Sequence, residues 1–132
     1  MTKIGFVGLG VMGGPMASHL SNNGYNLSVF NRSKEKSKKW LIENKEARVC
    51  LSLKDIAINS NIIILCVGND QDVRQVISEV TDWIRPGTVV IDHTTTSAKL
   101  AKDMNEILAK KESYFIDAPA VSYTHLTLPT KA

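Results

Sequence analysis

The sequence predicts an α/β fold in which a doubly wound, mostly parallel sheet carries helices on both faces. Short apolar runs alternate with longer amphipathic segments along the 132 residues, as in successive βαβ units. The clearest run, residues 62–67, is apolar throughout, as expected of a strand that is covered on both sides. Right-handed crossovers between such strands place the helices on both faces of the sheet.

The first expected strand is the apolar run at residues 4–7, and a helix follows at residues 12–22. Gly24 ends that helix, because glycine readily adopts the left-handed conformation found after helix ends. Residues 27–30 form the second expected strand. Ser33 then caps a Lys-rich helix that runs to about residue 44, since a Ser hydroxyl there can bond the free N–H groups of the first turn.

The middle of the chain continues this alternation. Residues 48–51 are a weak third strand, and residues 52–58 form a short helix. After the strand at residues 62–67, Asp70 or Asp72 is expected to cap a helix that runs to about residue 83, because Asp is among the preferred N-cap residues.

A turn at residues 85–87, which read Arg-Pro-Gly, leads into the last part of the predicted sheet. Residues 88–91 and 114–116 are the expected strands. Residues 97–111 form the helix between them, because apolar residues recur along one side at helical spacing. That side consists of Leu100, Met104, Ile107 and Leu108.

The charge and hydropathy of the chain argue against two classes of partner, nucleic acid and membranes. The net charge of +3 is too small to indicate nucleic-acid binding. No segment approaches the roughly 18 consecutive apolar residues of a membrane span, so we expect a cytoplasmic protein without a membrane partner. The one basic run is interrupted by Glu35 and indicates a solvated helix face, or alternatively help in holding a phosphate. It comprises Lys34, Lys36, Lys38 and Lys39.

The two cysteines, Cys50 and Cys66, each lie at or near the end of an apolar run. Neither belongs to a CxxC motif or has a His at ligand spacing. We therefore expect buried free thiols in a reducing compartment and no metal site.

The segment Gly8-Leu9-Gly10-Val11-Met12-Gly13 has the pattern G-x-G-x-x-G between a strand and a helix. That context makes the motif typical of a dinucleotide site. Gly8 allows a tight turn, Gly10 lets a pyrophosphate approach the backbone, and Gly13 lets the helix pack closely on the strand. The phosphates would face the first N–H groups of the helix. The alternative is a glycine-rich packing turn without a ligand.

The end of the second strand is where such folds select their cofactor. NAD-binding domains usually carry Asp or Glu there for the ribose 2′-hydroxyl, but this chain has Asn31-Arg32-Ser33. Arg32 offers a fork of donors suited to a phosphate, and Asn31 and Ser33 would add neutral hydrogen bonds. The segment favours NADP over NAD. The alternative is an ordinary surface Arg in a domain that still binds NAD.

These motifs resemble those of the 3-hydroxyisobutyrate dehydrogenase family, a β-hydroxyacid dehydrogenase group related to 6-phosphogluconate dehydrogenase. The glycine turn with the following Gly14-Pro15-Met16 resembles its N-terminal signature, and residues 31–33 are similar to NADP-preferring members. Asp92-His93-Thr94-Thr95 resembles its D-x-S-T segment, with Thr94 in place of the usual Ser. Asp117-Ala118-Pro119 resembles the start of its substrate loop.

The resemblance implies a Rossmann domain at residues 1–119 and a role for each matching position. Met12 and its neighbours in the glycine turn would contact the pyrophosphate through their backbone N–H groups. Val67 would lie beside the adenosine–nicotinamide cleft, and Thr95 would touch the nicotinamide end, unless Thr95 only caps the next helix. His93 is expected to have a structural or exposed role, since the family does not use this position for chemistry.

The resemblance also implies an oxidoreductase that acts on a small 3-hydroxy acid or the matching semialdehyde, usually as a homo-oligomer. The catalytic Lys and the C-terminal helical domain of the family would lie beyond residue 119, so no catalytic residue is assigned here. The alternatives are a nucleotide-binding module without activity, an imine reductase or a 6-phosphogluconate dehydrogenase-like enzyme. Arg32 argues against a methyltransferase.

The family pattern ends at Pro119. Residues 120–132 resemble one reading frame of a transposon adaptor used to fragment DNA for sequencing. We expect them to be a non-native tail that contributes nothing to fold or function. The alternative is a further strand, since Leu126 and Leu128 alternate with polar residues.

Overall fold

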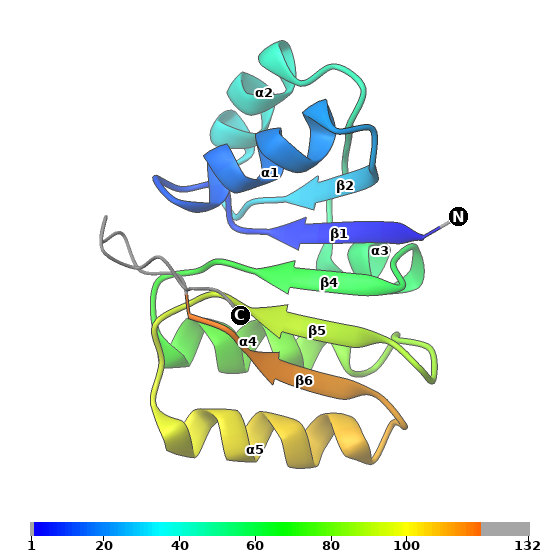
Figure 1. Ribbon diagram of the computed structural model, residues 1–132, viewed down its shortest axis with the longest axis vertical. Coiled ribbons are helices and arrows are strands. Elements are labelled where there is room, and N and C mark those ends of the chain that lie inside the picture. Colours follow the sequence, from blue (N-terminus) through cyan, green and yellow to red (C-terminus); the bar gives the residue numbers. More distant parts are fainter. Residues whose placement is uncertain (1, 120–132) are drawn as a thin grey trace, which may run out of the picture.

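The computed structural model describes residues 2–119, so the expected tail at residues 120–132 lies outside the described residues. The described chain forms a six-stranded sheet in the order β3-β2-β1-β4-β5-β6, with five helices. Every neighbouring pair of strands is parallel, and the labelled arrows in Figure 1 accordingly point the same way.

The strands are β1 (Lys3–Val7), β2 (Asn26–Phe30), β3 (Arg48–Val49), β4 (Ile62–Leu65), β5 (Val89–Asp92) and β6 (Tyr114–Asp117). The helices are α1 (Gly13–Asn22), α2 (Lys34–Glu43), α3 (Leu53–Ile58), α4 (Asp70–Val80) and α5 (Ala98–Ala109).

The predicted doubly wound α/β fold is confirmed. Strand β1 lies inside the sheet, where it pairs with β2 through Ile4 and Leu27 and with β4 through Ile4 and Ile62. Strands β2 and β3 follow one another on one side of β1. The chain then crosses back over the sheet, so that β4, β5 and β6 lie on the other side of β1. In open parallel sheets, this reversal of strand order leaves a crevice at the carboxyl ends of the strands.

Two apolar clusters cover the two faces of the sheet. One contains Ile4 and Phe6 of β1 together with Ala17 of α1, and Trp40 of α2 packs at its margin. The other joins the opposite faces of the strands, including Ile63 and Leu65, to helices α3, α4 and α5. Side chains of β4 therefore alternate between the clusters, and burial of each Ile or Leu contributes about 1.5–3 kcal/mol before entropy is counted.

The predicted cap of α2, Ser33, is confirmed, the predicted cap of α4 needs a correction, and the structure adds caps for α3 and α5. Ser33, Ser52 and Ser97 cap α2, α3 and α5 by accepting backbone N–H bonds. The cap of α4 is Asn69, whose Oδ1 accepts the N–H of Asp72 at 2.9 Å. The expectation of Asp70 or Asp72 was wrong because Asn69 has the extended backbone that precedes the helix, whereas both acids lie in its first turn.

Several predicted boundaries or surfaces differ from the structure. The run predicted as a strand at residues 62–67 is a strand at Ile62–Leu65. The weak third strand ends at Val49, and Leu51 is 74% exposed. Helix α4 ends at Val80 rather than near residue 83, and Trp83 is 46% exposed. In α5, Leu100, Met104 and Leu108 are buried as expected, but Ile107 is 37% exposed because it lies at the margin of the covered face.

Candidate functional site

The glycine turn after β1 is held by backbone contacts that only glycine permits. Gly8 has a φ of +106°, and its N–H donates to the Phe30 carbonyl of β2 at 3.0 Å. A Cβ atom on Gly8 would overlap the carbonyl oxygen of Cys66, and one on Gly13 would overlap the carbonyl oxygen of Gly8. The turn therefore packs tightly against β4 and against the first turn of α1.

Gly10, in contrast, faces open space. A Cβ atom built there would meet nothing within 4 Å outside its chain neighbours. Gly10 lines a cleft of about 840 Å³ that runs along the carboxyl edge of the sheet. That volume lies within the roughly 300–1,000 Å³ range of small-molecule and cofactor sites.

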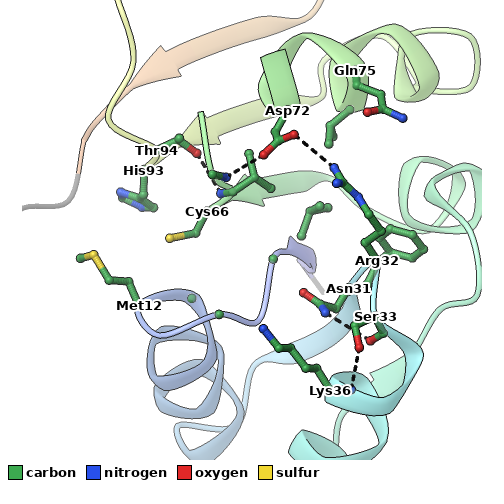
Figure 2. A pocket seen from close by; sticks show the side chains of 18 of the residues that line it. Met12, Asn31, Arg32, Ser33, Lys36, Cys66, Asp72, Gln75, His93 and Thr94 are labelled. Carbon is green, nitrogen blue, oxygen red and sulfur yellow. Dashed lines mark hydrogen bonds and ion pairs between the residues drawn. The ribbon is translucent and has the colours of Figure 1, made fainter. Parts of the chain in front are cut away.

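The cleft contains all but one of the residues that the sequence singled out as cofactor contacts. Its two ends are defined here as the Arg32 end, beside β2, and the Thr95 end, beside β5; Figure 2 shows Arg32 on one side and His93 and Thr94 on the other. The predicted residues that line it are Gly8, Gly10, Val11, Met12, Gly13, Asn31, Arg32, Ser33, Val67 and Thr95.

Leu9 is the exception, and the Asn31 amide makes contacts that the sequence did not predict. The Leu9 side chain is buried in the cluster below α1, and its N–H donates to Asn31 Oδ1 at 2.8 Å. Asn31 Nδ2 in turn donates to the Ser33 carbonyl at 3.2 Å. The Asn31 amide thus fastens the glycine turn to the end of β2, and its hydrogen bond to a cofactor stays a prediction.

Cationic side chains gather at the Arg32 end. Arg32 follows β2 and is 74% exposed, and Lys36 extends from the first turn of α2. Of the four lysines in the basic run, Lys36 alone lines the cleft, which separates it from its solvated neighbours. The Ser33 side chain is engaged as the α2 cap, where Oγ accepts the Lys36 N–H at 3.3 Å.

Helix α4 supplies a wall of the Arg32 end that sequence reasoning missed. Asp72, Gln75, Val76 and Glu79 line the cleft from this helix. The Asp72 carboxylate lies 3.2 Å from the Arg32 guanidinium, across the cleft from β2 (Figure 2). In the sequence, the helical spacing of these residues indicates that they share one face of α4. Only the strand order shows that this face lies opposite Arg32.

Helix α1 differs from the other helices at its N-terminus. Its N-cap residue, Met12, makes no side-chain cap bond, whereas α2, α3, α4 and α5 each have a Ser or Asn cap. In the first turn, the Gly14 N–H already donates to the Gly10 carbonyl at 2.9 Å, and Pro15 has no N–H. The backbone N–H groups without a side-chain acceptor at this positive end of the helix dipole are therefore those of residues 10–13. This arrangement favours an anionic ligand.

Hydrogen bonds through Thr94 join two loops at the Thr95 end. Val67 N–H donates to Thr94 Oγ1 at 2.9 Å, and Thr94 N–H donates to Asp92 Oδ1 at 2.9 Å. Thr95 is exposed and lines the cleft, while Ser97 caps α5, so the alternative role of Thr95 as the helix cap is wrong. The Asp92 side chain is fully buried, and its Oδ2 has no partner among the described residues.

Burial raises the pKa of two groups below this end. It raises the pKa of the Asp92 carboxyl, an effect opposed by the hydrogen bonds from Thr94 and reinforced by the nearby Asp117. Burial and the Asp92 charge raise the pKa of the Cys66 thiol. Cys66 is half-buried rather than buried as expected, whereas Cys50 is buried, and both are free thiols. A thiol with a raised pKa is a poor nucleophile at neutral pH.

His93 lines the Thr95 end, and its Nδ1 lies 2.6 Å from the Ala118 carbonyl. Because a carbonyl only accepts hydrogen bonds, the proton lies on Nδ1 in this pair. The imidazole therefore ties β5 to the segment after β6, in agreement with the expected structural role.

Two classes of site are absent from the part of the chain that the structure describes. Residues 2–119 contain no cluster of three or more His, Cys, Asp or Glu side chains that could hold a metal ion. None of the described helices is long and apolar enough to cross a membrane.

Comparisons with known proteins agree with this geometry. An uncharacterized oxidoreductase of Shewanella frigidimarina (strain NCIMB 400) is 38% identical over 122 residues, which cover 90% of this chain and 42% of the relative. The mitochondrial 3-hydroxyisobutyrate dehydrogenase of Drosophila melanogaster is also 38% identical, over 89% of this chain and 36% of its own.

A solved structure shows the same arrangement. The 3-hydroxyisobutyrate dehydrogenase of Mycobacterium tuberculosis, determined with L-serine, superposes with a TM-score of 0.86 at 26% identity, covering 92% of this chain and 41% of that one. The chain thus spans about two-fifths of the length of the proteins that it matches.

The family model for the NAD binding domain of 6-phosphogluconate dehydrogenase matches residues 3–123. This match includes the glycine turn, the Arg32 end and the Thr95 end of the cleft. The chain therefore belongs to the family of NAD-binding domains found in 6-phosphogluconate dehydrogenase.

Proposed function

We propose that this chain holds NADP(H) in the cleft, as the cofactor domain of an oxidoreductase that acts on the CH–OH group of a small 3-hydroxy acid or on the matching semialdehyde. The observation that carries the proposal is the uncapped start of α1 beside Gly10, in one cleft with Arg32 and Lys36. This cleft offers backbone N–H groups and two cations to the phosphates of a dinucleotide.

The residues present fit the cofactor. The N–H groups of residues 10–13, at the start of α1, would hold the pyrophosphate, and the absent side chain of Gly10 leaves room for its approach. Arg32 and Lys36 would bind the 2′-phosphate. Val67 and Thr95 would flank the nicotinamide, which supplies the hydride chemistry when bound. The bonds among Asp92, Thr94 and Val67 hold these two loops in place.

The names of the relatives support the substrate class. Several carry the name 3-hydroxyisobutyrate dehydrogenase. In our proposal the proton-transferring Lys and the helical domain belong to a part of the protein beyond residue 119, and the whole protein is a homo-oligomer. The proposed location is cytoplasmic, although the names of several relatives include the word mitochondrial.

Binding of NADPH to Gly10→Val tests the proposed site. A Val side chain would fill the space above the turn, so the variant should lose nucleotide binding while retaining its fold. NADPH titration followed by nucleotide fluorescence measures the first effect, and far-ultraviolet circular dichroism measures the second. Binding as tight as that of the parent would show that the glycine turn is not the site.

The cofactor preference is tested by titrating NADPH and NADH into the same chain. NADPH should bind more tightly because of Arg32. Arg32→Asp should weaken NADPH binding by about 1.5–3 kcal/mol, the scale of a charged hydrogen bond. Lys39→Asp is the matched charge reversal, because Lys39 is exposed on α2 outside the cleft, and it should have a much smaller effect. Equal affinity for NADPH and NADH would contradict the NADP preference.

A further inference from the structure

The Arg32 guanidinium has an acidic partner inside the same cleft. Arg32 Nη2 donates to Asp72 Oδ1 at 3.2 Å, although the residues lie 40 positions apart in the sequence. Figure 2 shows this bond crossing from the end of β2 to the first turn of α4. Arg32 forms no other ion pair within residues 2–119. A carboxylate thus engages the side chain on which the NADP preference depends.

Asp72 is fixed in position by its own element. Its other carboxylate oxygen, Oδ2, accepts the Gly68 N–H at 3.2 Å, and its backbone N–H donates to Asn69 Oδ1 at 2.9 Å. A Cβ atom on Gly68 would lie 2.7 Å from Asp72 Oδ2, so the glycine makes room for the carboxylate. The exposed fraction of the side chain is 25% for Asp72 and 74% for Arg32. Arg32 is therefore the partner that can move away.

Two other charged side chains, Lys36 and Glu79, line the Arg32 end. Lys36 lines the cleft and forms no ion pair within residues 2–119. Glu79 adds a second acid to the α4 wall. Asp72, however, is the acid that contacts Arg32, so a phosphate bound by Arg32 has to share the guanidinium with it or displace it.

We propose that Asp72 is a specificity-determining residue, whose carboxylate competes with the 2′-phosphate of NADP(H) for Arg32 and so narrows the preference for NADP(H) over NAD(H). This inference rests on the proposed function. NAD(H) carries a hydroxyl in place of that phosphate, so its binding does not require Arg32 to leave Asp72. Asp72, which would weaken the NADP preference that Asn31-Arg32-Ser33 indicates, therefore lies on a different element, α4.

The geometry favours competition over positioning of Arg32. A single bond of 3.2 Å to an exposed guanidinium is longer than the roughly 2.7–2.9 Å of strong charge-assisted bonds, so it restrains Arg32 weakly. The charge of Asp72, in contrast, remains in place because α4 holds it. Its removal should leave Arg32 free to pair with a phosphate.

Asp72→Asn tests the inference in the full 132-residue chain. Asn keeps an acceptor for the Gly68 N–H and removes the charge. NADPH should bind about two- to fivefold more tightly, the size of an exposed ion pair, while the affinity for NADH changes by less than about twofold. The gain for NADPH should shrink at high salt, because the Debye length falls from about 10 Å at 0.1 M to about 3 Å at 1 M.

Asp103→Asn is the matched control. Asp103 pairs with Arg74 and Lys99 at 2.9 Å and does not line the cleft, so its substitution should leave both affinities unchanged. In the Arg32→Ala background, Asp72→Asn should have much less effect on NADPH than in the parent. An equal effect there would overturn the competition for Arg32. If Asp72→Asn does not fold, Asp72→Ser provides the same comparison with a hydroxyl acceptor.

The outcomes separate this inference from the proposed function. An unchanged ratio of NADPH to NADH affinity in a variant that binds both would overturn the role of Asp72 alone. A loss of NADPH affinity in Asp72→Asn would also overturn it, because Asp72 would then position Arg32 for the phosphate. Failure of the parent chain to bind either nucleotide would overturn the proposed function and this inference with it.

Discussion

The glycines of the turn differ in what a side chain would meet at each position. At Gly8 and Gly13 it would meet backbone oxygen atoms, those of Cys66 directly after β4 and of Gly8 in the turn itself. At Gly10 it would meet open cleft. The same residue type therefore supports the fold at two positions and leaves space for a ligand at the third.

Stability measurements on single alanine variants separate these roles. Gly13→Ala should lower the free energy of unfolding by about 1–3 kcal/mol, as overpacking does in cores, because its Cβ overlaps the Gly8 carbonyl oxygen. Gly10→Ala should stay within about 0.5 kcal/mol of the parent. Urea unfolding of both variants gives the comparison. Equal stability of the two would show that Gly13 has more freedom than the structure indicates.

The buried carboxyl of Asp92 gives stability a dependence on pH. Its pKa is raised in the folded chain by burial, so folding favours the protonated form. Its contribution is most favourable below the unfolded pKa of about 3.9 and is lost as pH rises through the raised folded value. Asp92→Asn removes this titration and can keep an acceptor for the Thr94 N–H.

Urea unfolding between pH 4 and pH 7, values chosen to begin at about the unfolded pKa of Asp, measures this contribution. The free energy of unfolding of the parent minus that of Asp92→Asn should fall as pH rises. The difference between the two chains isolates Asp92 from the other titrating groups. A flat or rising difference would mean that the folded chain does not favour the protonated carboxyl.

At the scale of elements, most of the fold was predictable because its signals are local. The apolar runs at β1, β2 and β4 mark buried strands, and Ser33, Ser52 and Ser97 each stand where the side chain caps the following helix. The cap of α4 was less clear, since Asn69, Asp70 and Asp72 are all good N-cap residues. Backbone conformation selects Asn69, and sequence spacing does not report it.

The cap of α4 can be tested by truncation. Asn69→Ala removes the acceptor of the Asp72 N–H and should cost about 1 kcal/mol of stability. Gln71→Ala is the control, since Gln71 is exposed on the same first turn and should change stability by less than about 0.5 kcal/mol. Chemical unfolding of both variants measures the difference. A smaller loss in Asn69→Ala than in Gln71→Ala would contradict the assigned cap.

The candidate site was predictable where the signal is a short motif and not where it depends on packing between elements. The glycine turn and Arg32 were found because their residues lie at fixed offsets from strand ends. The bond from Leu9 to Asn31 spans 22 positions, and that from Arg32 to Asp72 spans 40. Such pairs form only once β2, β1 and β4 are adjacent, so the sequence predicted neither the bond from Leu9 to Asn31 nor the pairing of Asp72 with Arg32.

At the scale of the whole molecule, the cleft joins the two halves of the sheet. The end of β2 and the glycine turn lie on one side of the reversal in strand order, and the ends of β4 and β5 lie on the other. A dinucleotide that binds both sides would stabilise the folded chain by an amount that grows with its free concentration relative to Kd, about 2.7 kcal/mol when that concentration is one hundred times Kd.

Thermal unfolding with and without NADPH measures this effect. NADPH should raise the Tm of the parent chain and leave the Tm of Gly10→Val unchanged. A similar rise in both chains would place the bound nucleotide outside the cleft. Adenosine alone is a useful comparison, since it lacks the pyrophosphate and should raise the Tm less than NADPH does at equal concentration.

The 132-residue chain should bind the cofactor without turning over a substrate. The relatives are more than twice as long as the region that this chain matches, and our proposal assigns the proton-transferring Lys to the remainder. Absorbance of NADPH during incubation of the purified chain with small 3-hydroxy acids gives the measurement. Turnover above that of Gly10→Val would show that the described domain carries the catalytic groups.

The bond from Leu9 to Asn31 has a consequence for the rate of nucleotide binding. It holds the glycine turn against β2 before any ligand arrives, so no loop has to be ordered during association. Stopped-flow mixing with NADPH should therefore give a single phase whose rate rises linearly with nucleotide concentration. In Asn31→Ala the turn loses this support, and the observed rate should level off at high concentration, where reordering of the turn becomes the slow step.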